Sequence, residues 1–532
     1  MNRVQEQFRA LIIRPITWVL VLGLAIRIYA CLTTYIINPD GIHYIHQARA
    51  IFYQDWSSLT SCHLKYLSIL PILIVAAYSV LQDWIIAGLC VSTLFGFATL
   101  FPLYFLLRRF FDETLSSITL LIFVLIPFFV SRSANVLRDP VFWFFIASGM
   151  LLFLRQWDEP FQGRRDRYSA VLSSLCFLLA TWARVEGVMF FAVSAGYLLI
   201  ASTDRRLERL FFFLSPVLVL GIAAFAGILL ADSRAVYLQK INQIPHELVQ
   251  AAPLYETLRD EIETLAAQNP GYVGKFLYQV RKIAWLVPFG LVFTYIIKAL
   301  SYPYAFIFFL GCVGMFRRVG AQQRMGYLLW LSFFSILVLC VHLIATWHIY
   351  NRFLAILILP GCVVMGLGVD NVIRFLQQRL QIRQRAALLL LLSFILLFGL
   401  TKNLSPNEKD KVIYRQAAEI IARHKAPQQV ARIAAQYSNV YEWVFFYAHL
   451  DYPGTLCARP LCGTIGTDYE QFLLDLKENG IRYVLFEEKV WPVGRLDLKA
   501  APYERDFRLL GKWHHKSTGD LLLLERLSGE NT

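Results

Sequence analysis

Residues 16–50 read ITWVLVLGLAIRIYACLTTYIINPDGIHYIHQARA, an apolar segment followed directly by a carboxylate, two histidines and a tyrosine. The apolar part, residues 16–36, is long enough to cross a hydrocarbon core of about 30 Å as a helix. It is too long for the apolar region of a signal peptide and has no small-residue cleavage site. We therefore expect a first membrane span here. The polar stretch behind it is either a surface turn or the first part of a site.

The rest of the chain has the same apolar character. Of its 532 residues, 57% are hydrophobic and 17% are charged, which in a soluble protein would leave large apolar patches exposed. The net charge of +14 would suggest nucleic acid binding in a soluble protein, but the arginines and lysines here cluster in short loops between apolar runs. Such loops set the orientation of membrane proteins. The sequence indicates a multi-pass α-helical membrane protein without a nucleic acid partner.

The basic loops predict the topology. If all of them face the cytoplasm, they alternate with the other loops without contradiction, which puts the amino terminus inside and the tail outside. Two further apolar stretches, 66–82 and 284–300, each contain a proline. If only one of them crossed the membrane, every later basic loop would be placed on the outer side. We expect these two in the outer interface, so the count is eleven to thirteen spans. The eleven lie near 16–36, 84–107, 115–130, 141–156, 169–183, 188–203, 210–230, 303–316, 325–345, 353–374 and 386–401.

Composition changes abruptly where the last span ends. We expect a transmembrane domain over residues 1–402, with outward loops at 37–83 and 231–302, and an outward soluble α/β domain over 403–532. Strand-like runs in the tail (430–435, 481–487, 521–527) alternate with helical stretches (near 409–424 and 468–479). Outside the cytoplasm, Cys457 and Cys462 are candidates for a disulfide, although close spacing alone does not determine the geometry.

Four outward loops carry ionisable residues. In the first, Asp40 and Tyr44 share a helix face, and Asp40 is either a helix cap or a functional carboxylate. In the second, Asp139 precedes Pro140 at a helix start and has the same two readings. The third has Arg184 and Glu186 and the fourth His348, Tyr350 and Arg352; an arginine there either binds a ligand or reaches the interface. Because the inner loops hold mainly arginine and lysine, we expect these side chains to converge on one outward site.

These residues resemble the GT-C membrane glycosyltransferases, specifically the dolichyl-phosphate-mannose protein mannosyltransferase and lipid A aminoarabinose transferase family (glycosyltransferase family 39-like). The family's first outward loop has the form D-E-x-x-Y-x-x-x-A; Asp40, Tyr44 and Ala48 match it, and Gly41 replaces the second acid. Leu137 to Pro140 is similar to the family's second acidic loop. His348 to Phe353 is similar to its late H-x-x-x-R-[YF] pattern. The resemblance covers the chain from about residue 15 to the end.

The resemblance implies a GT-C fold and a sugar transferase of the bacterial inner membrane. The donor would be a polyprenyl-phosphate sugar, and the acceptor a hydroxyl of a lipid, glycan or protein on the periplasmic face. An inverting reaction needs a base and positive charge for the leaving phosphate. We expect Asp40 as the base and Asp139 as a second acid. Phosphate or substrate contacts are expected from Lys65, which otherwise reaches the interface as a snorkelling lysine, and from Tyr44, Arg184, Glu186 (orienting Arg184), His348, Tyr350 and Arg352.

A cofactor and two other functions stay open from the sequence. A divalent cation, if one is used, would be bound by Asp40 or Asp139, with His43 as a further candidate; His43 and His46 are three residues apart on a helix. A transporter or flippase of a lipid-linked or anionic substrate would show inverted repeats and charges near mid-membrane. A sensor or scaffold would tolerate substitution of the loop acids. Within the enzymes, a polyprenyl-diphosphate oligosaccharide ligase is the nearest rival.

Overall fold

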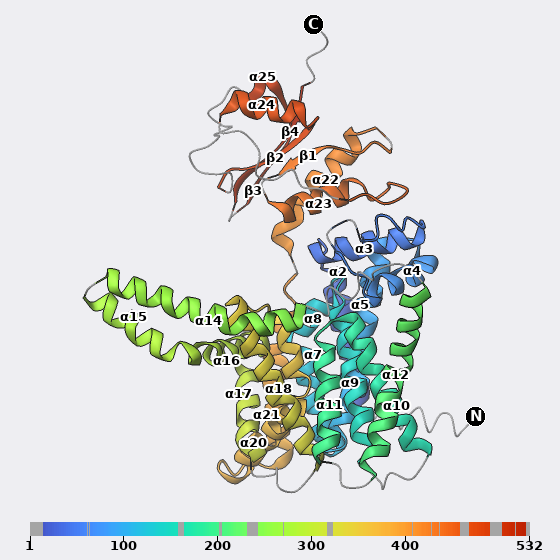
Figure 1. Ribbon diagram of the computed structural model, residues 1–532, viewed down its shortest axis with the longest axis vertical. Helices are drawn as coiled ribbons and strands as arrows, with labels where there is room; N and C mark the ends of the chain where they lie inside the picture. The colour runs from blue at the N-terminus through green and yellow to red at the C-terminus, as the bar shows by residue number, and fades with distance from the viewer. Residues whose placement is uncertain are drawn as a thin grey trace.

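The computed structural model describes the chain from residue 14 to residue 527. The positions outside this description are 61, 63, 158–163, 202–204, 231–242, 270, 317–322, 407, 427, 436, 458–467, 490–502 and 516–517. Within it, a bundle of long helices carries a small α/β domain at one end (Figure 1). The two parts meet at helix α3 (Pro39–Phe52), which follows the first long helix.

Each of the eleven expected spans falls on helix. The helices of the bundle and its loops are α2 (Pro15–Leu32), α3 (Pro39–Phe52), α4 (Ile69–Leu81), α5 (Trp84–Ala98), α6 (Leu100–Leu107), α7 (Glu113–Leu125), α8 (Pro127–Ser133), α9 (Asp139–Arg155), α10 (Arg164–Ala183), α11 (Gly187–Ala201), α12 (Arg206–Leu230), α14 (Gln243–Gln268), α15 (Tyr272–Ile283), η1 (Ala284–Leu286), α16 (Val287–Leu300), α17 (Tyr302–Phe316), α18 (Gln323–Thr346), η3 (Asn351–Leu354), α19 (Ala355–Ile358), α20 (Cys362–Gln378) and α21 (Gln384–Asn403).

Two expected spans are broken rather than straight. Helices α7 and α8 meet at an angle of 61°, because Pro127 removes a backbone donor and ends α7 before it. The second break, of 72°, separates η3 and α19 from α20. The first span is also shorter than expected, since α2 ends at Leu32 rather than at residue 36. Sequence hydrophobicity does not report where a helix bends, because the residues on both sides of the bend stay apolar.

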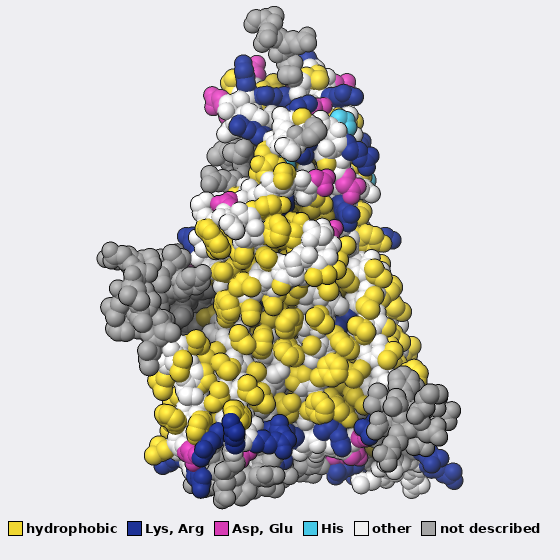
Figure 2. All heavy atoms as spheres, turned by 90° about the vertical axis from the view of Figure 1, so that its right-hand side faces the viewer, with side chains coloured by type: hydrophobic (Ala, Val, Ile, Leu, Met, Phe, Trp, Pro, Cys, Tyr) yellow, Lys and Arg dark blue, Asp and Glu magenta, His cyan; other side chains and the backbone are white. Residues whose placement is uncertain are grey.

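On the face seen in Figure 2, hydrophobic side chains cover the bundle, and Lys and Arg side chains gather at its end away from the α/β domain. Among the described residues, five helices are long and apolar enough to cross a membrane, or seven if each bent pair is one span. One of the five is residues 272–300, which includes the stretch expected in the interface. The other such stretch forms only α4, which is shorter than a span. In Figure 1, α14 and α15 extend sideways from the bundle. Length and hydrophobicity do not place residues 284–300 relative to a membrane, so their expected position in the outer interface remains a prediction.

The tail contains a four-stranded sheet in the order β1-β2-β4-β3. Strand β1 pairs parallel to β2, and the other pairings are antiparallel. The predicted strand runs are present, but β3 and helix α23 are missing from the prediction; β3 is a mostly exposed strand that lacks a buried run. The tail elements are η4 (Lys409–Lys411), α22 (Val412–His424), β1 (Ile433–Ala435), α23 (Ser438–Ala448), α24 (Tyr469–Glu478), β2 (Tyr483–Glu487), α25 (Tyr503–Asp506), β3 (Phe507–His515) and β4 (Gly519–Arg526).

Helix α23 docks the tail onto the start of α3. The Trp443 indole donates to the carbonyl of Ile37 at 2.8 Å, and the Ile37 N–H donates to the Tyr447 hydroxyl at 3.0 Å. A disulfide joins Cys62 of the first outward loop to Cys457 of the tail. Cys457 is therefore not bonded to Cys462, the candidate partner that the sequence offered. The prediction considered the cysteine nearest in sequence, whereas the docked tail brings a cysteine from 395 positions away.

The disulfide can be tested by labelling. Neither Cys62 nor Cys457 should react with a maleimide in the native protein until a reductant is added, and Cys457→Ser should expose Cys62. Because the bond closes a very long loop, we expect its loss to destabilise docking of the tail by about 2–4 kcal/mol. Mass spectrometry of alkylated peptides measures the labelling. Free reactivity of both cysteines without reductant would contradict the bond.

Candidate functional site

The helix that carries Asp40 starts two residues earlier than an Asp40 cap would place it. Asn38, not Asp40, is the N-cap of α3: its side-chain oxygen accepts from the Asp40 N–H at 3.0 Å. The reading of Asp40 as a cap is therefore wrong. Its carboxylate is left for another partner, and Oδ2 accepts from Nη1 of Arg352 at 2.6 Å.

The first and second outward loops are packed together by small residues. A Cβ on Gly41 would lie 2.9 Å from both the Cβ and the carbonyl oxygen of Val136, and one on Gly88 would lie 2.8 Å from the Val136 side chain. Real Cβ atoms do not approach this closely, so Val136 inserts between two glycines. This explains why glycine stands where the resembled family has a second acid. A carboxylate side chain at position 41 would push the second loop away.

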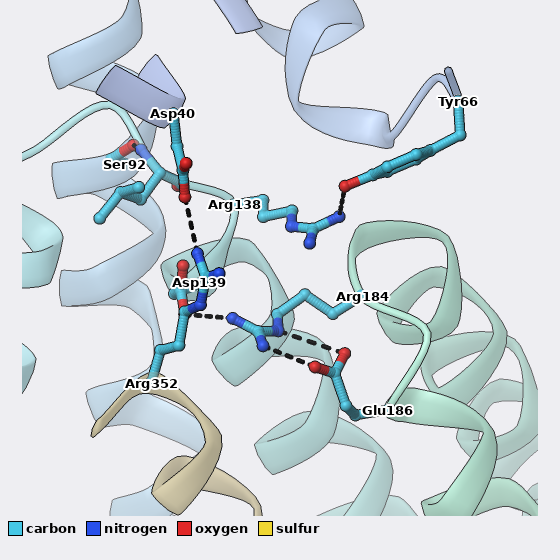
Figure 3. A network of polar contacts seen from close by, with 9 residues as sticks. Asp40, Tyr66, Ser92, Arg138, Asp139, Arg184, Glu186 and Arg352 are labelled. Carbon is cyan, nitrogen blue, oxygen red and sulfur yellow. Dashed lines mark hydrogen bonds and ion pairs between the residues drawn. The ribbon is translucent and has the colours of Figure 1, made fainter. Parts of the chain in front are cut away.

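Hydrogen bonds hold the second loop in the same place. The Asn38 N–H donates to the Asn135 side chain at 3.0 Å, and the Ser92 hydroxyl bonds both the N–H and the carbonyl of Leu137 at 3.1 Å. The backbone just before Asp139 is thus anchored to α3 and to α5. The two carboxylates reach one region from different helices (Figure 3).

Three carboxylates and two arginines form the centre of this region (Figure 3). Arg184 lies between Asp139 and Glu186, and its guanidinium donates to an oxygen of each at 2.6 Å. This group is buried: the Arg184 and Asp139 side chains are 3% and 2% exposed. The Asp40–Arg352 pair is more open, since the Asp40 side chain is 40% exposed. Asp40 is therefore the acid that a ligand from outside can reach, while Asp139 is buried and bonded to Arg184.

The buried ion pair keeps Arg184 and Glu186 charged. Burial opposes ionisation of Glu186, but the Arg184 guanidinium outweighs it and lowers the pKa of Glu186 to about 2. Burial would also lower the pKa of Arg184, yet Glu186 and Asp139 raise it above its ordinary value. Burial raises the pKa of the Tyr44 phenol, so Tyr44 stays protonated at neutral pH. Tyr44 is suited to packing and hydrogen bonding.

A third arginine, Arg138, was not among the predicted site residues. It donates to the Tyr66 hydroxyl, and its guanidinium lies 5.2 Å from the Tyr66 ring centre and 6.0 Å from that of Tyr44. Such cation–π contacts fix the plane of a guanidinium. The signal was available in the sequence, because Arg138 directly precedes Asp139 in the second loop.

These arginines stand at one end of a cavity of about 530 Å³. Arg138, Arg184 and Arg352 all line it, together with Glu186 and His342. The remaining walls are almost entirely apolar and come mainly from α11 and α18; they include Met189, Val193, Trp330, Phe334 and Val338. A cavity with three guanidinium groups at one end and an apolar body matches a ligand with an anionic head and a hydrocarbon tail.

The other predicted residues lie at the edge of this region or away from it. His348 and Tyr350 are exposed and pack edge to face, and the Arg352 guanidinium lies 4.9 Å from the Tyr350 ring centre. Lys65 is exposed beside Tyr66 and does not line the cavity. The structure thus brings Asp40, Tyr44, Asp139, Arg184, Glu186 and Arg352 together, with His348 and Tyr350 on the rim and Lys65 outside.

The histidines of α3 contact the tail and the first outward loop. His43 Nε2 lies 3.4 Å from a Glu442 oxygen, and both ring nitrogens of His46 face backbone carbonyls. Asp40 and Asp139 are each paired with an arginine, and no three His, Cys, Asp or Glu side chains among the described residues are grouped to hold a metal. The donor set around the two acids does not fit a resident cation.

A buried histidine in the tail makes the stability of the tail sensitive to acid. His449 accepts from the Ala431 N–H at 2.9 Å, and burial lowers its pKa to about 4. Between this value and the unfolded value of about 6.5, the unfolded tail binds more protons, so stability is lost as pH falls through this window, by about 3 kcal/mol in all. Thermal unfolding between about pH 7.5 and pH 4 measures the loss. His449→Gln should flatten it; an unchanged pH profile in this variant would contradict the assignment.

Comparison with known proteins identifies the architecture. No protein-family model and no curated protein matches the sequence. Among solved structures, ArnT from Cupriavidus metallidurans bound to undecaprenyl phosphate aligns with 96% of this chain and 98% of its own, with a TM-score of 0.58 at 11% identity. The archaeal oligosaccharyltransferase AglB from Archaeoglobus fulgidus, in complex with an inhibitory peptide and a dolichol-phosphate, aligns with 97% and 74% at a TM-score of 0.51 and 12% identity.

The chain has the GT-C fold. The expected fold class, a multi-pass helical membrane protein with a small soluble domain, is confirmed by these alignments and by the apolar helices. At identities this low the likeness extends to the GT-C fold and not to individual residues. The roles of the site residues rest on the geometry described above.

Proposed function

We propose that this protein is a glycosyltransferase that moves a sugar from a polyprenyl-phosphate-linked donor to an acceptor hydroxyl. The observation that carries the proposal is the cavity between α11 and α18, which has Arg138, Arg184 and Arg352 at one end and an apolar body. A guanidinium matches phosphate oxygens in a bidentate fork, and the apolar walls fit the start of a prenyl chain. Two aligned GT-C structures contain undecaprenyl phosphate and a dolichol-phosphate, which supports this class of ligand.

In the proposed reaction the acceptor oxygen attacks the anomeric carbon as the bond from that carbon to the lipid phosphate oxygen breaks. The lipid phosphate leaves with the bonding electrons and is stabilised by the arginines. Asp40 takes the acceptor proton, because it is the exposed acid at the centre of the site. Attack opposite the leaving group inverts the anomeric carbon. Asp139 and Glu186 orient Arg184 and keep its charge in place.

The pairing of Asp40 with Arg352 suggests how the donor prepares the base. The two side chains are in contact at 2.6 Å, so the carboxylate is partly neutralised before substrate binds. A donor phosphate at the end of the cavity competes for Arg352, which also lines that cavity. Donor binding would then free Asp40 to accept a proton. No step in this scheme uses a metal, in keeping with the arginine pairing of both acids.

We further propose that the site faces the periplasm of a bacterial inner membrane. Lys and Arg side chains gather at the opposite end of the bundle, as expected for a cytoplasmic face (Figure 2). The Cys62–Cys457 disulfide joins the first loop to the tail on the side of the site, and such bonds persist in oxidising compartments. Both observations favour a cytoplasmic amino terminus and a periplasmic tail.

The proposed function is tested with purified protein in nanodiscs and a panel of polyprenyl-phosphate sugars. Release of free lipid phosphate and transfer of sugar are measured. Arg138→Gln should raise the donor concentration needed for half-maximal rate by about tenfold or more, because one charge-assisted phosphate contact is lost. Arg379→Gln is the matched control, since Arg379 is exposed and does not line the cavity. Failure of the wild type to consume any donor in the panel would overturn the proposal, and transport of a lipid-linked substrate would then be assayed.

A further inference from the structure

A second cavity lies at the other end of the bundle. It has a volume of about 660 Å³ and is bounded by the ends of α6 and α9 and the starts of α10 and α18. Five arginines line it: Arg108, Arg109, Arg155, Arg165 and Arg324. Asp166 is the one acid among the described residues that line it.

This cavity is separate from the site described above. Helix α9 begins at Asp139, in the outer site, and ends at Arg155, in the second cavity. At 1.5 Å per residue these two positions are about 24 Å apart along the helix axis. The two cavities thus occupy opposite ends of the same helices, and a ligand bound to one does not touch the other.

Basic residues at the inner end of a membrane protein are expected from its orientation alone. Orientation alone places basic residues in loops that face water. It does not require arginines at the ends of four helices to line one cavity. Arg108 is also held in position, because its Nη1 donates to the Phe111 carbonyl at 2.9 Å. A group of five guanidiniums against one carboxylate matches a ligand with several anionic oxygens, above all a phosphate.

The cavity has an apolar wall as well as a basic one. Phe105, Leu151 and Leu152 line it beside the arginines, and Phe105 is 55% exposed on the surface of the bundle. A ligand in the cavity can therefore extend a hydrocarbon chain along this wall into the surrounding bilayer. Such a combination of basic and apolar walls is suited to the headgroup of an anionic lipid.

We propose that this cavity is a second anion site that binds a phosphate group, as the headgroup of an anionic phospholipid or as a soluble phosphate. Binding there would join the ends of α6, α9, α10 and α18. The same helices α9, α10 and α18 contribute to the outer site, so occupancy would stabilise the frame that holds it. The inference does not depend on the proposed sugar transfer.

The test uses the full-length protein and two probes. In one arm, retention of phosphatidylglycerol over phosphatidylcholine is measured by native mass spectrometry after extraction from mixed nanodiscs. In the other, stabilisation by inorganic phosphate is followed by thermal unfolding. The variant is Arg155→Gln with Arg165→Gln. The control is Arg164→Gln with Arg379→Gln, which removes the same charge from two exposed arginines that do not line the cavity.

We expect the cavity variant to lose about tenfold or more in affinity for the probe that binds, and the control to keep wild-type affinity. Loss in the phosphatidylglycerol arm identifies a lipid headgroup, and loss in the phosphate arm a soluble phosphate. If the double variant does not fold, Arg165→Gln alone is used, because Arg165 is exposed. Equal binding by the cavity variant and the control in both arms would overturn the proposal.

Discussion

Asp40→Asn should lower the rate of sugar transfer by about 10²–10⁴-fold, the usual contribution of a general base. The variant should fold, because Asn38 and not Asp40 caps α3, and because Asp40 is 40% exposed. Arg352 loses its carboxylate partner in this variant and is left free for the donor phosphate. The donor concentration for half-maximal rate should therefore stay equal or fall while the maximal rate collapses.

Asp83→Asn is the matched control for this experiment. This substitution makes the same chemical change in the same outward loop. The side-chain oxygen of Asp83, however, caps α5 by accepting from the Ile86 N–H at 2.8 Å. Asparagine caps as well as aspartate, so rate and stability should stay near wild type. Transfer by Asp40→Asn at the rate of Asp83→Asn would show that Asp40 is not the base.

Arg184→Gln should destabilise the protein by about 3–5 kcal/mol, because it leaves two buried carboxylates without a cation. Asp139 and Glu186 each bond this guanidinium at 2.6 Å, and the Arg184 side chain is only 3% exposed. Thermal unfolding in nanodiscs measures the effect. Sugar transfer should also fall sharply, since the phosphate contact proposed for Arg184 is lost.

A triple variant separates these two losses. Adding Asp139→Asn and Glu186→Gln removes the unpaired charges, so most of the stability should return while transfer stays low. Arg374→Gln is the control for loss of an arginine: its pair with Asp370 lies at the surface, with the Arg374 side chain 55% exposed, and such pairs contribute about 0–1 kcal/mol. An Arg184→Gln protein as stable as Arg374→Gln would contradict the buried ion-pair network.

The candidate site shows how far sequence reasoning reaches, because the structure brings the chosen side chains together while their roles stay predictions. Asp40, Asp139, Arg184 and Arg352 could be chosen because ionisable groups in outward loops stand out against apolar spans. Their partners could not: the pairing of Asp40 with Arg352 joins residues 312 positions apart. Arg138 was passed over because its role depends on the rings of Tyr44 and Tyr66, which reach it only in the folded protein.

The absence of a second acid after Asp40 has a similar explanation. From the sequence, Gly41 was a departure from the pattern of the resembled family. In the structure it is a packing requirement, since Val136 leaves no room for a Cβ. A steric demand of this kind comes from a residue 95 positions away, so local sequence patterns carry no trace of it.

By itself the sequence determined the membrane class and the apolar segments that form helices of the bundle, because hydrophobicity in a bilayer follows directly from composition. It also determined most strands of the tail, whose buried runs are continuous. Only the tertiary structure decided the docking of α23 beside the start of α3 and the disulfide between Cys62 and Cys457. These features depend on contacts between distant segments, which hydrophobic periodicity along the chain does not encode.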